Sequence, residues 1–295
     1  MFKNFYLKYI KDDLVAKVIA ANVAVYIFFL FIGFFSMLFN VVGIANVFRV
    51  SLELPASLPR ILVSPWSLLT YMFVHAGVWH LVWNMIALYG FGKIFMNFYS
   101  SRHFIGIYLL GGLSGAIFYV ASYNLFPYFA PLLGSSHLVG ASAAVIAIIV
   151  AAAVRSPEYR VGLFLFGSVR LSTLAIVTVV ISVLMLPGDN AGGNFAHIGG
   201  AFAGWLVAYM LGKGADIVEI LGKPFVWLCS LFKRRPKKKS KFTYVRGDRN
   251  PDYEYNARKK ADEAEVDRIL EKIKQGGYAS LSDEEKRRLF EASSK

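Results

Sequence analysis

The sequence predicts an all-α fold: a polytopic membrane bundle of six transmembrane helices, followed by a small helical cytoplasmic tail. Composition is the first observation, because 56% of the 295 residues are hydrophobic and only 17% are charged, whereas about a quarter of an average globular chain is charged. The uneven distribution of charge is the second, since residues 1–212 hold only 11 of the 32 Lys and Arg residues. The chain therefore divides into an apolar body and a short basic tail.

Six apolar stretches are candidates for the spans, because a helix needs about 20 apolar residues to cross the hydrocarbon core of a bilayer. The stretches are 18–39, 69–90, 104–125, 141–154, 171–186 and 195–211. The fourth and fifth are short, so they must lie inside the bundle or be extended by flanking residues. The first follows a mixed-charge lead without a small-residue cleavage site, which favours a span over a signal peptide. The semi-apolar loop 43–68 is expected to lie partly in the membrane interface.

Basic residues predict how the bundle is oriented, because Lys and Arg collect on the cytoplasmic side of a membrane. If the N-terminus is cytoplasmic, the outer segments of the body contain only Arg49 and Arg60. We therefore expect both termini in the cytoplasm, in agreement with an even number of spans. The net charge of +13 then fits contact with anionic lipid. The tail has no recognised nucleic-acid motif, so we expect no nucleic-acid partner.

Three parts are expected along the chain: a transmembrane domain, an interfacial and polybasic linker, and a cytoplasmic tail. Their ranges are 1–212, 213–241 and 242–295. In the linker, residues 215–232 are typical of an interfacial helix, and the basic run 233–241 would bind anionic lipid of the inner leaflet. A linker that lies in solvent agrees with the sequence equally well.

The tail predicts a helical hairpin. Disorder is expected over 242–256, followed by short helices over 262–274 and 283–293 on either side of a Gly-Gly pair at 276–277. Ser282 and Glu285 have the spacing of a capping box, which would begin the second helix.

Five polar residues stand out inside or beside the predicted spans, where polar side chains are costly and are functional candidates. They are His75, His80, Asn84, Ser142 and His197. The orientation, which was deduced from Lys and Arg alone, places all five in the outer half of the bilayer. Five candidates from three different helices therefore converge at one depth.

Ser142 is the candidate nucleophile. It lies in Gly140-Ala-Ser-Ala, after a loop and at the beginning of an Ala-rich helix. A serine hydroxyl needs a neighbouring base to become a nucleophile, and a helix N-terminus offers free N–H groups for a developing oxyanion. Gly140 would allow a tight turn beside it. The alternative is an ordinary helix N-cap, a position that serine favours.

His197 is the candidate base, since a neutral histidine can take the serine proton and return it to the leaving amine. It precedes a stripe of small residues at helical spacing, which lets another helix approach closely. The two stripes that would pack together are Gly200, Gly204 and Ala208, and Ala143, Ala147 and Ala151. This packing would bring Ser142 towards His197. The alternative is a histidine that is merely satisfied by a hydrogen bond.

His80 and Asn84 are four residues apart and share one face of the second span. Both offer side-chain donors, which could complete an oxyanion hole with the Ser142 amide; ordinary interhelical hydrogen bonding is the alternative. His75, five residues before His80, is expected to point elsewhere and to have a structural role in the outer loop.

Three motifs, His75-Ala-Gly-Val-Trp-His-Leu-Val-Trp-Asn84, Gly140-Ala-Ser-Ala and Ala196-His-Ile-Gly-Gly200, resemble the signature segments of the rhomboid intramembrane serine proteases. The resemblance covers roughly 14–212 and is to the bacterial six-helix type. It implies a Ser142/His197 dyad and an oxyanion site of His80, Asn84 and the Ser142 amide. It also implies cleavage of transmembrane protein substrates near the outer ends of their spans, a bacterial inner membrane, and neither metal nor cofactor.

Two positions depart from the family pattern. The family often has Trp-Arg in the first outer loop, where this chain has Trp66-Ser67, and an aromatic residue four after the nucleophile, where it has Ile146. Neither change removes a reacting group. Asp189 lies in a turn sequence and is not assigned to the site.

Two other classes remain as rivals to a protease. One is a catalytically silent protein that binds transmembrane helices, and the other is a transporter, which would need repeats and ionisable groups near the midplane. A metalloprotease is disfavoured because the HExxH pattern is absent.

Overall fold

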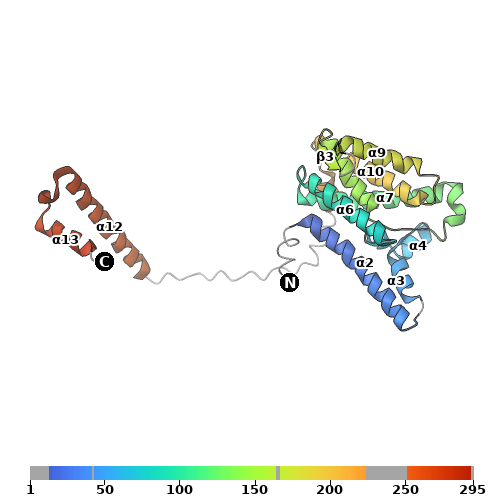
Figure 1. Ribbon diagram of the computed structural model, residues 1–295, viewed down its shortest axis with the longest axis horizontal. Coiled ribbons are helices and arrows are strands. Elements are labelled where there is room, and N and C mark those ends of the chain that lie inside the picture. The colour runs from blue at the N-terminus through green and yellow to red at the C-terminus, as the bar shows by residue number, and fades with distance from the viewer. Residues whose placement is uncertain (1–12, 42, 164–166, 224–250, 294–295) are drawn as a thin grey trace. The chain divides into compact units, whose positions relative to one another are not determined.

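The computed structural model describes residues 13–41, 43–163, 167–223 and 251–293. The chain forms two compact units, 1–233 and 234–295 (Figure 1). Each unit is described by itself.

The first unit has six apolar helices within the described residues, and each overlaps one of the predicted spans. They are α2 (Leu14–Leu38), α6 (Val78–Met96), α7 (Ser101–Leu125), α8 (Ser142–Arg155), α9 (Leu171–Leu184) and α10 (Ala191–Gly212). By length and composition, α2, α7 and α10 are each able to cross a membrane, and α8 and α9 are shorter apolar helices. The predicted all-α membrane bundle is confirmed.

Short elements fill the two long loops at the end of the bundle where α8 begins. The first loop contains α3 (Ile44–Leu52), β1 (Leu54–Pro55), α4 (Leu58–Val63), α5 (Ser67–Thr70) and η2 (Tyr71–Phe73); the second contains η3 (Pro127–Leu132) and β2 (His137–Leu138). The two strands pair antiparallel, with Leu54 opposite Leu138, and thus join the loops. At the other end of α8, β3 (Arg160–Leu163) and β4 (Gly167–Arg170) form a hairpin. The interfacial position expected for the first loop stays a prediction.

Helix α8 lies at the centre of the bundle and contacts α6, α7, α9 and α10; α7, α9 and α10 lie beside one another in Figure 1. Every residue of α8 from Ala143 to Ala153 is buried. A Cβ atom added at Gly200 or Gly204 of α10 would collide with the carbonyl oxygen of Ala143 or Ala147, respectively. The predicted packing of the two small-residue stripes is therefore present.

A third helix uses the same kind of contact. On α7, Gly111 and Gly115 lie so close to α8 that an added Cβ would meet Ala147 or Ala143. Glycines four residues apart in an apolar span are a known signal of close helix packing, but the sequence analysis did not use this pair. Helix α8 is thus held between α10, whose glycines lie against its backbone, and α7, whose glycines lie against its alanine methyl groups.

The second span was wrongly placed at 69–90, because its apolar N-terminal part is not helical throughout. The chain forms α5 and η2, then runs through extended Val74 and Gly77 before α6 begins at Val78. His75 therefore precedes the helix instead of lying on it. The C-terminus extends to Met96, and Lys93 in the last turn is favourably placed for the negative end of the helix dipole.

Three other helices, α2, α7 and α10, begin earlier than predicted. Asp13 accepts hydrogen bonds from the backbone N–H groups of Val15 and Ala16, so α2 begins at Leu14. Helix α10 begins at Ala191, where Gly192 leaves room for the ring of Tyr119; a Cβ there would lie 2.7 Å from it.

The segment after α10 packs back onto the start of α7. Val218 is buried and lies against Gly106, and Asp216 pairs with Arg102 at 2.6 Å. Burial acts to raise the pKa of Asp216, but the Glu219 N–H and the His103 and Arg102 side chains outweigh it and hold the pKa below its usual range. The described start of the predicted linker, up to residue 223, thus contacts the bundle through Val218 and Asp216. Residues 224–241, including the basic run, lie outside the described residues, so the choice between an interfacial and a solvated linker stays open.

The second unit is the predicted hairpin. It consists of α12 (Pro251–Gly276), η4 (Tyr278–Ser280) and α13 (Asp283–Ser293), and the chain turns at Gly277, which has a φ of +72°. The Ser282 N–H donates to the Glu285 carboxylate at 2.8 Å and the Glu285 N–H donates to Ser282 Oγ at 3.3 Å, which is the capping box. Hydrogen bonds from Lys272 and from the Ser282 N–H lower the pKa of Glu285 to about 2.

The disorder predicted over 242–256 is wrong for its second part. Residues 251–256 belong to α12, which begins at a proline, a favoured residue in the first helical turn. Residues 242–250 lie outside the described part of the chain.

Because Gly204 packs directly on the backbone of α8, we predict that Gly204→Val lowers the free energy of unfolding by about 1–3 kcal/mol, the usual cost of overpacking. Denaturation in detergent micelles, followed by circular dichroism, measures the change. Gly90→Val is the matched control, because a Cβ at Gly90 meets nothing within 4 Å. Equal stability of the two variants would contradict the packing described here.

Candidate active site

Ser142 and His197 form a hydrogen bond at the N-terminal ends of two packed helices. The Ser142 Oγ lies 2.7 Å from His197 Nε2. Ser142 is the first residue of α8, and His197 lies in the second turn of α10. The pair meets because Gly200, one turn after His197, packs on Ala143. A serine that is hydrogen-bonded to an imidazole nitrogen has the arrangement needed to lose its proton to that nitrogen.

Ser142 is not the N-cap of its helix. The N-cap is Ala141, which makes no side-chain capping bond, and the Ser142 hydroxyl is used by His197 instead. The backbone N–H of Ser142 belongs to the first turn, where N–H groups have no partner within the helix. The ordinary-cap alternative is therefore excluded, and a free backbone donor lies beside the hydroxyl.

His80 lies next to the turn that presents Ser142. Gly140 has a φ of +116°, and its N–H donates to the carbonyl oxygen of Tyr71 at 3.0 Å. A Cβ at Gly140 would lie 2.6 Å from the His80 ring. Glycine is therefore required at position 140 for two reasons: the backbone has a positive φ, and the His80 ring leaves no room for a Cβ atom.

His75 contacts His80, contrary to the expectation that it points elsewhere. The centroids of the two rings are 5.2 Å apart, with an interplanar angle of 68°. The expectation assumed that both residues lie on one helix, five positions apart. Because α6 begins only at Val78, the preceding extended segment is free to return His75 to the ring of His80. His75 is buried, and its structural role stays a prediction.

Asn84 is buried one turn below His80 on α6. Its side-chain Nδ2 donates to the carbonyl oxygen of His80 at 2.8 Å. An amide group has two N–H bonds, so this contact fixes the side chain and leaves one donor for a further acceptor.

Ser182, which was not among the candidates predicted from the sequence, also contacts His197. Its Oγ lies 3.4 Å from His197 Nδ1, the second ring nitrogen, and it is buried on α9. The available signal was a serine in the middle of an apolar span, where a polar group is costly unless it has a partner. Asp189, by contrast, lies exposed in the loop between α9 and α10.

The two departures from the family pattern have defined surroundings. The Trp66 indole N–H donates to the carbonyl oxygen of Ser51 at 2.8 Å, which ties α5 to the end of α3. The following Ser67 is fully buried. Ile146 is buried on α8, one turn after Ser142.

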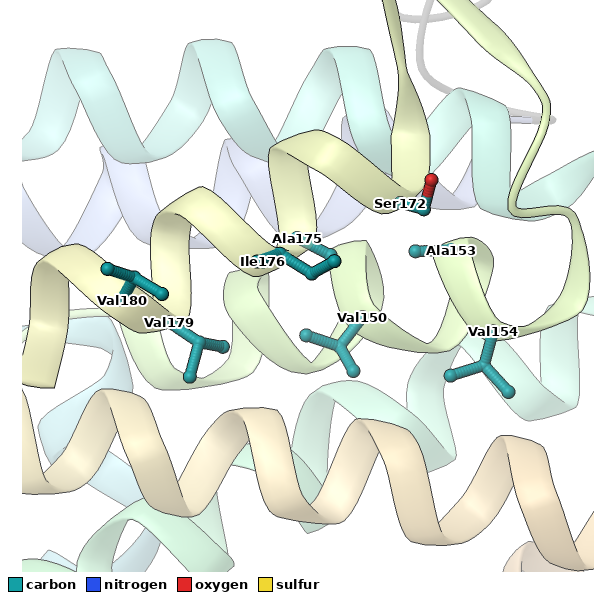
Figure 2. A pocket seen from close by; sticks show the side chains of 8 residues that line it. All are labelled: Val150, Ala153, Val154, Ser172, Ala175, Ile176, Val179 and Val180. Atoms are coloured by element: carbon teal, nitrogen blue, oxygen red, sulfur yellow. The ribbon is translucent and has the colours of Figure 1, made fainter.

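The apolar groove in Figure 2 is separate from this site. It has a volume of about 320 Å³ and lies between the C-terminal half of α8, at Val150 to Val154, and α9. Its lining includes neither Ser142 nor His197.

Fold and site together define a class of protein: a polytopic helical membrane protein with a Ser–His pair at one end of its central helices. A family model described as the Rhomboid domain matches residues 63–214. The chain therefore belongs to the rhomboid family. A second model, a family of unknown function (DUF6576), matches residues 250–295.

Curated relatives agree with this assignment. The chain is 29% identical to "Rhomboid protease GluP" of Bacillus subtilis over 155 residues, 50% of this chain and 26% of the relative. It is 33% identical to "RHOMBOID-like protein 6, mitochondrial" of Arabidopsis thaliana over 151 residues, 50% of this chain and 43% of the relative. It is 29% identical to the human "Presenilin-associated rhomboid-like protein, mitochondrial" over 160 residues, 52% of this chain and 39% of the relative. The chain thus spans less than half the length of these relatives.

Because Gly140 has a left-handed conformation and lies against His80, we predict that Gly140→Ala lowers the free energy of unfolding by about 1–3 kcal/mol, the usual cost of a strained backbone position. Unfolding in mixed micelles with increasing SDS measures it. Gly134→Ala, in the same loop, is the control, since its Cβ meets nothing within 4 Å. The description of the turn is refuted if Gly140→Ala is as stable as this control.

Proposed function

We propose that the protein is an intramembrane serine endopeptidase that hydrolyses peptide bonds in or near the transmembrane segments of other membrane proteins. The observation that carries the proposal is the 2.7 Å hydrogen bond between Ser142 Oγ and His197 Nε2. Membership of the rhomboid family and a relative whose name contains "protease" support it.

In the proposed reaction, Ser142 Oγ attacks the carbonyl carbon of the scissile bond while His197 Nε2 takes its proton. The same proton passes from His197 to the departing amine as the C–N bond breaks, which leaves an acyl-serine. A water molecule, deprotonated by His197, then attacks the acyl carbon, and the serine leaves with the proton.

The negatively charged oxygen of each tetrahedral intermediate must be stabilised by hydrogen-bond donors. The Ser142 backbone N–H at the helix N-terminus is one, and the side chains of His80 and Asn84 supply the others. The contact of His80 with Gly140 and the hydrogen bond from Asn84 to the His80 carbonyl support this role, because they hold both side chains on the Ser142 side of α6.

The protein is an integral membrane protein, and we place its termini in the cytoplasm and its active site towards the outer side. The charge distribution supports this orientation. Lys93, Arg102, Arg155 and Lys213 lie at the ends of α6, α7, α8 and α10 that are opposite to the site, as expected for the cytoplasmic ends of spans. A bacterial inner membrane and anionic lipid at the basic run 233–241 complete the proposal.

The alternative is a rhomboid-like protein that binds transmembrane helices without cleaving them. Several relatives carry names that state no activity. A silent protein has no need to keep a nucleophile and a base in hydrogen-bond contact, so the Ser142–His197 pair favours the protease.

We expect the purified protein to cleave a single-span reporter with a Gly/Ala-rich segment and Ser142→Ala to lower the rate by at least ~10³-fold, because no other group replaces the nucleophile. Appearance of the cleaved fragment on gels measures the rate. Ser135→Ala, which changes an exposed serine in the preceding loop, should cleave at the wild-type rate.

Cleavage by both wild type and Ser142→Ala would show a contaminant or a different nucleophile. No cleavage by the wild type, across several reporters and with no labelling by a serine-directed probe, would favour the binding alternative.

His80→Ala and Asn84→Ala are expected to lower kcat by about 10²-fold, the effect of removing one oxyanion donor, with little change in KM. Initial rates over a range of reporter concentrations in micelles separate the two constants. Asn97→Ala, at the exposed opposite end of α6, is the control. A wild-type kcat in both site variants would remove these residues from the oxyanion site.

A further inference from the structure

The catalytic proposal requires one particular tautomer of His197. Nε2 must be unprotonated in the resting state so that it can accept the proton of Ser142, and the proton of the neutral ring must therefore be on Nδ1. In a histidine, the hydrogen bond made by one ring nitrogen determines which of the two carries the proton. The partner of Nδ1 therefore decides whether His197 can act as a base.

That partner is Ser182 on α9. Its Oγ lies 3.4 Å from His197 Nδ1 and 3.0 Å from the backbone carbonyl oxygen of Thr178. A carbonyl oxygen can only accept, and a serine hydroxyl has a single proton, so this proton is directed to Thr178. The Ser182 oxygen is then left as an acceptor for a proton on Nδ1.

The three hydrogen bonds form a chain with one consistent direction. Ser142 O–H donates to His197 Nε2, His197 Nδ1–H donates to Ser182 Oγ, and Ser182 O–H donates to the Thr178 carbonyl. The opposite direction would leave the Thr178 carbonyl without this donor and would place a proton on Nε2, where it blocks the base.

The position of Ser182 on its helix agrees with this role. Its side chain is 3% exposed, whereas its neighbours Ile181 and Val183 are 49% and 47% exposed. Burying a hydroxyl inside a membrane bundle is costly unless it is hydrogen-bonded. Ser182 thus lies on the inward face of an otherwise apolar helix, with its two partners in reach.

We propose that Ser182 is a positioning residue that holds His197 in the tautomer with the proton on Nδ1 and steadies the charged ring during the reaction. The inference rests on the proposed protease function and deepens it. When His197 takes the proton of Ser142, both ring nitrogens carry hydrogen, and the Ser182 oxygen accepts from the positive ring. The 3.4 Å separation is expected to shorten at that moment, as such contacts do when charge develops.

The role also makes activity depend on where α9 lies. Ser142 and His197 belong to α8 and α10, which pack closely, whereas Ser182 belongs to α9, which borders the groove on α8 (Figure 2). Displacement of α9 would remove the acceptor from Nδ1 without moving the dyad.

The kinetic test compares Ser182→Ala with Ser182→Thr. Loss of one hydrogen bond to a charged group is expected to lower kcat by roughly 10-fold to 100-fold in Ser182→Ala, with KM little changed. Ser182→Thr keeps a hydroxyl and should recover most of the loss. An unchanged kcat in Ser182→Ala would overturn the proposal.

Two controls change a hydroxyl on the same helix without touching His197. The Thr178 side chain donates to the carbonyl oxygen of Leu174, so Thr178→Val leaves the Thr178 carbonyl in place. Ser172 lies at the other end of α9, beside the groove. Thr178→Val and Ser172→Ala should both keep the wild-type kcat.

The decisive measurement is spectroscopic and needs no turnover. Nitrogen-15 NMR of histidine-labelled protein distinguishes the two tautomers, and the His197 signals are assigned by their absence in His197→Gln. We expect the proton on Nδ1 in the wild type, and a shift of the population towards Nε2 in Ser182→Ala.

A wild-type ring protonated on Nε2 overturns the assignment whatever the variants do. Protonation on Nδ1 that depends on Ser182, in a protein that cleaves no reporter, supports the role of Ser182 and counts against the protease function alone.

Discussion

The structure depends on the close approach of α8 to its two neighbours α7 and α10. Side chains between these helices are reduced to hydrogen or methyl groups. Gly200 and Gly204 of α10 lie against the backbone of α8, and Gly111 and Gly115 of α7 lie against its alanine methyl groups. In a membrane no hydrophobic effect drives helices together, and dispersion contacts of this kind provide the association. The approach fixes the axial register of α8 and α10, and the register in turn sets Ser142 opposite His197.

Close packing also explains where polar groups can exist in this fold. Burying a hydroxyl, amide or imidazole among apolar helices is costly unless a partner lies within hydrogen-bond reach. Asn22 on α2, for example, donates to the Val18 carbonyl and to the Tyr108 hydroxyl. Ser182 and His197 satisfy each other in the same way. Ser142 on α8, His197 on α10 and Ser182 on α9 are thus joined by hydrogen bonds that run between helices.

Much of this arrangement could be predicted from the sequence because it follows from one-dimensional patterns. Apolar length gave six helices, and the spacing of small residues predicted that α10 packs on α8. The start of α6 could not be found in this way, because the apolar run continues through η2 and only the extended backbone at Val74 and Gly77 interrupts it. Two contacts of the site could not be predicted either: His75 with His80, and Ser182 with His197. Each joins two segments, and the local sequence of a segment does not determine how it is rotated relative to the other.

The shortness of α9 has a consequence for the bilayer itself. Its 14 residues extend only about 21 Å at 1.5 Å per residue, whereas the hydrocarbon core is about 30 Å thick. Helix α8 is equally short but is surrounded by protein, while α9 exposes Ile176 and Leu184 on its outer side. Local thinning of the bilayer beside α9 is one of the known responses to a span this short. With such thinning, a substrate helix of the proposed protease that approached along α9 would pass from a thicker layer to a thinner one, and the residues at its ends would emerge among headgroups and water.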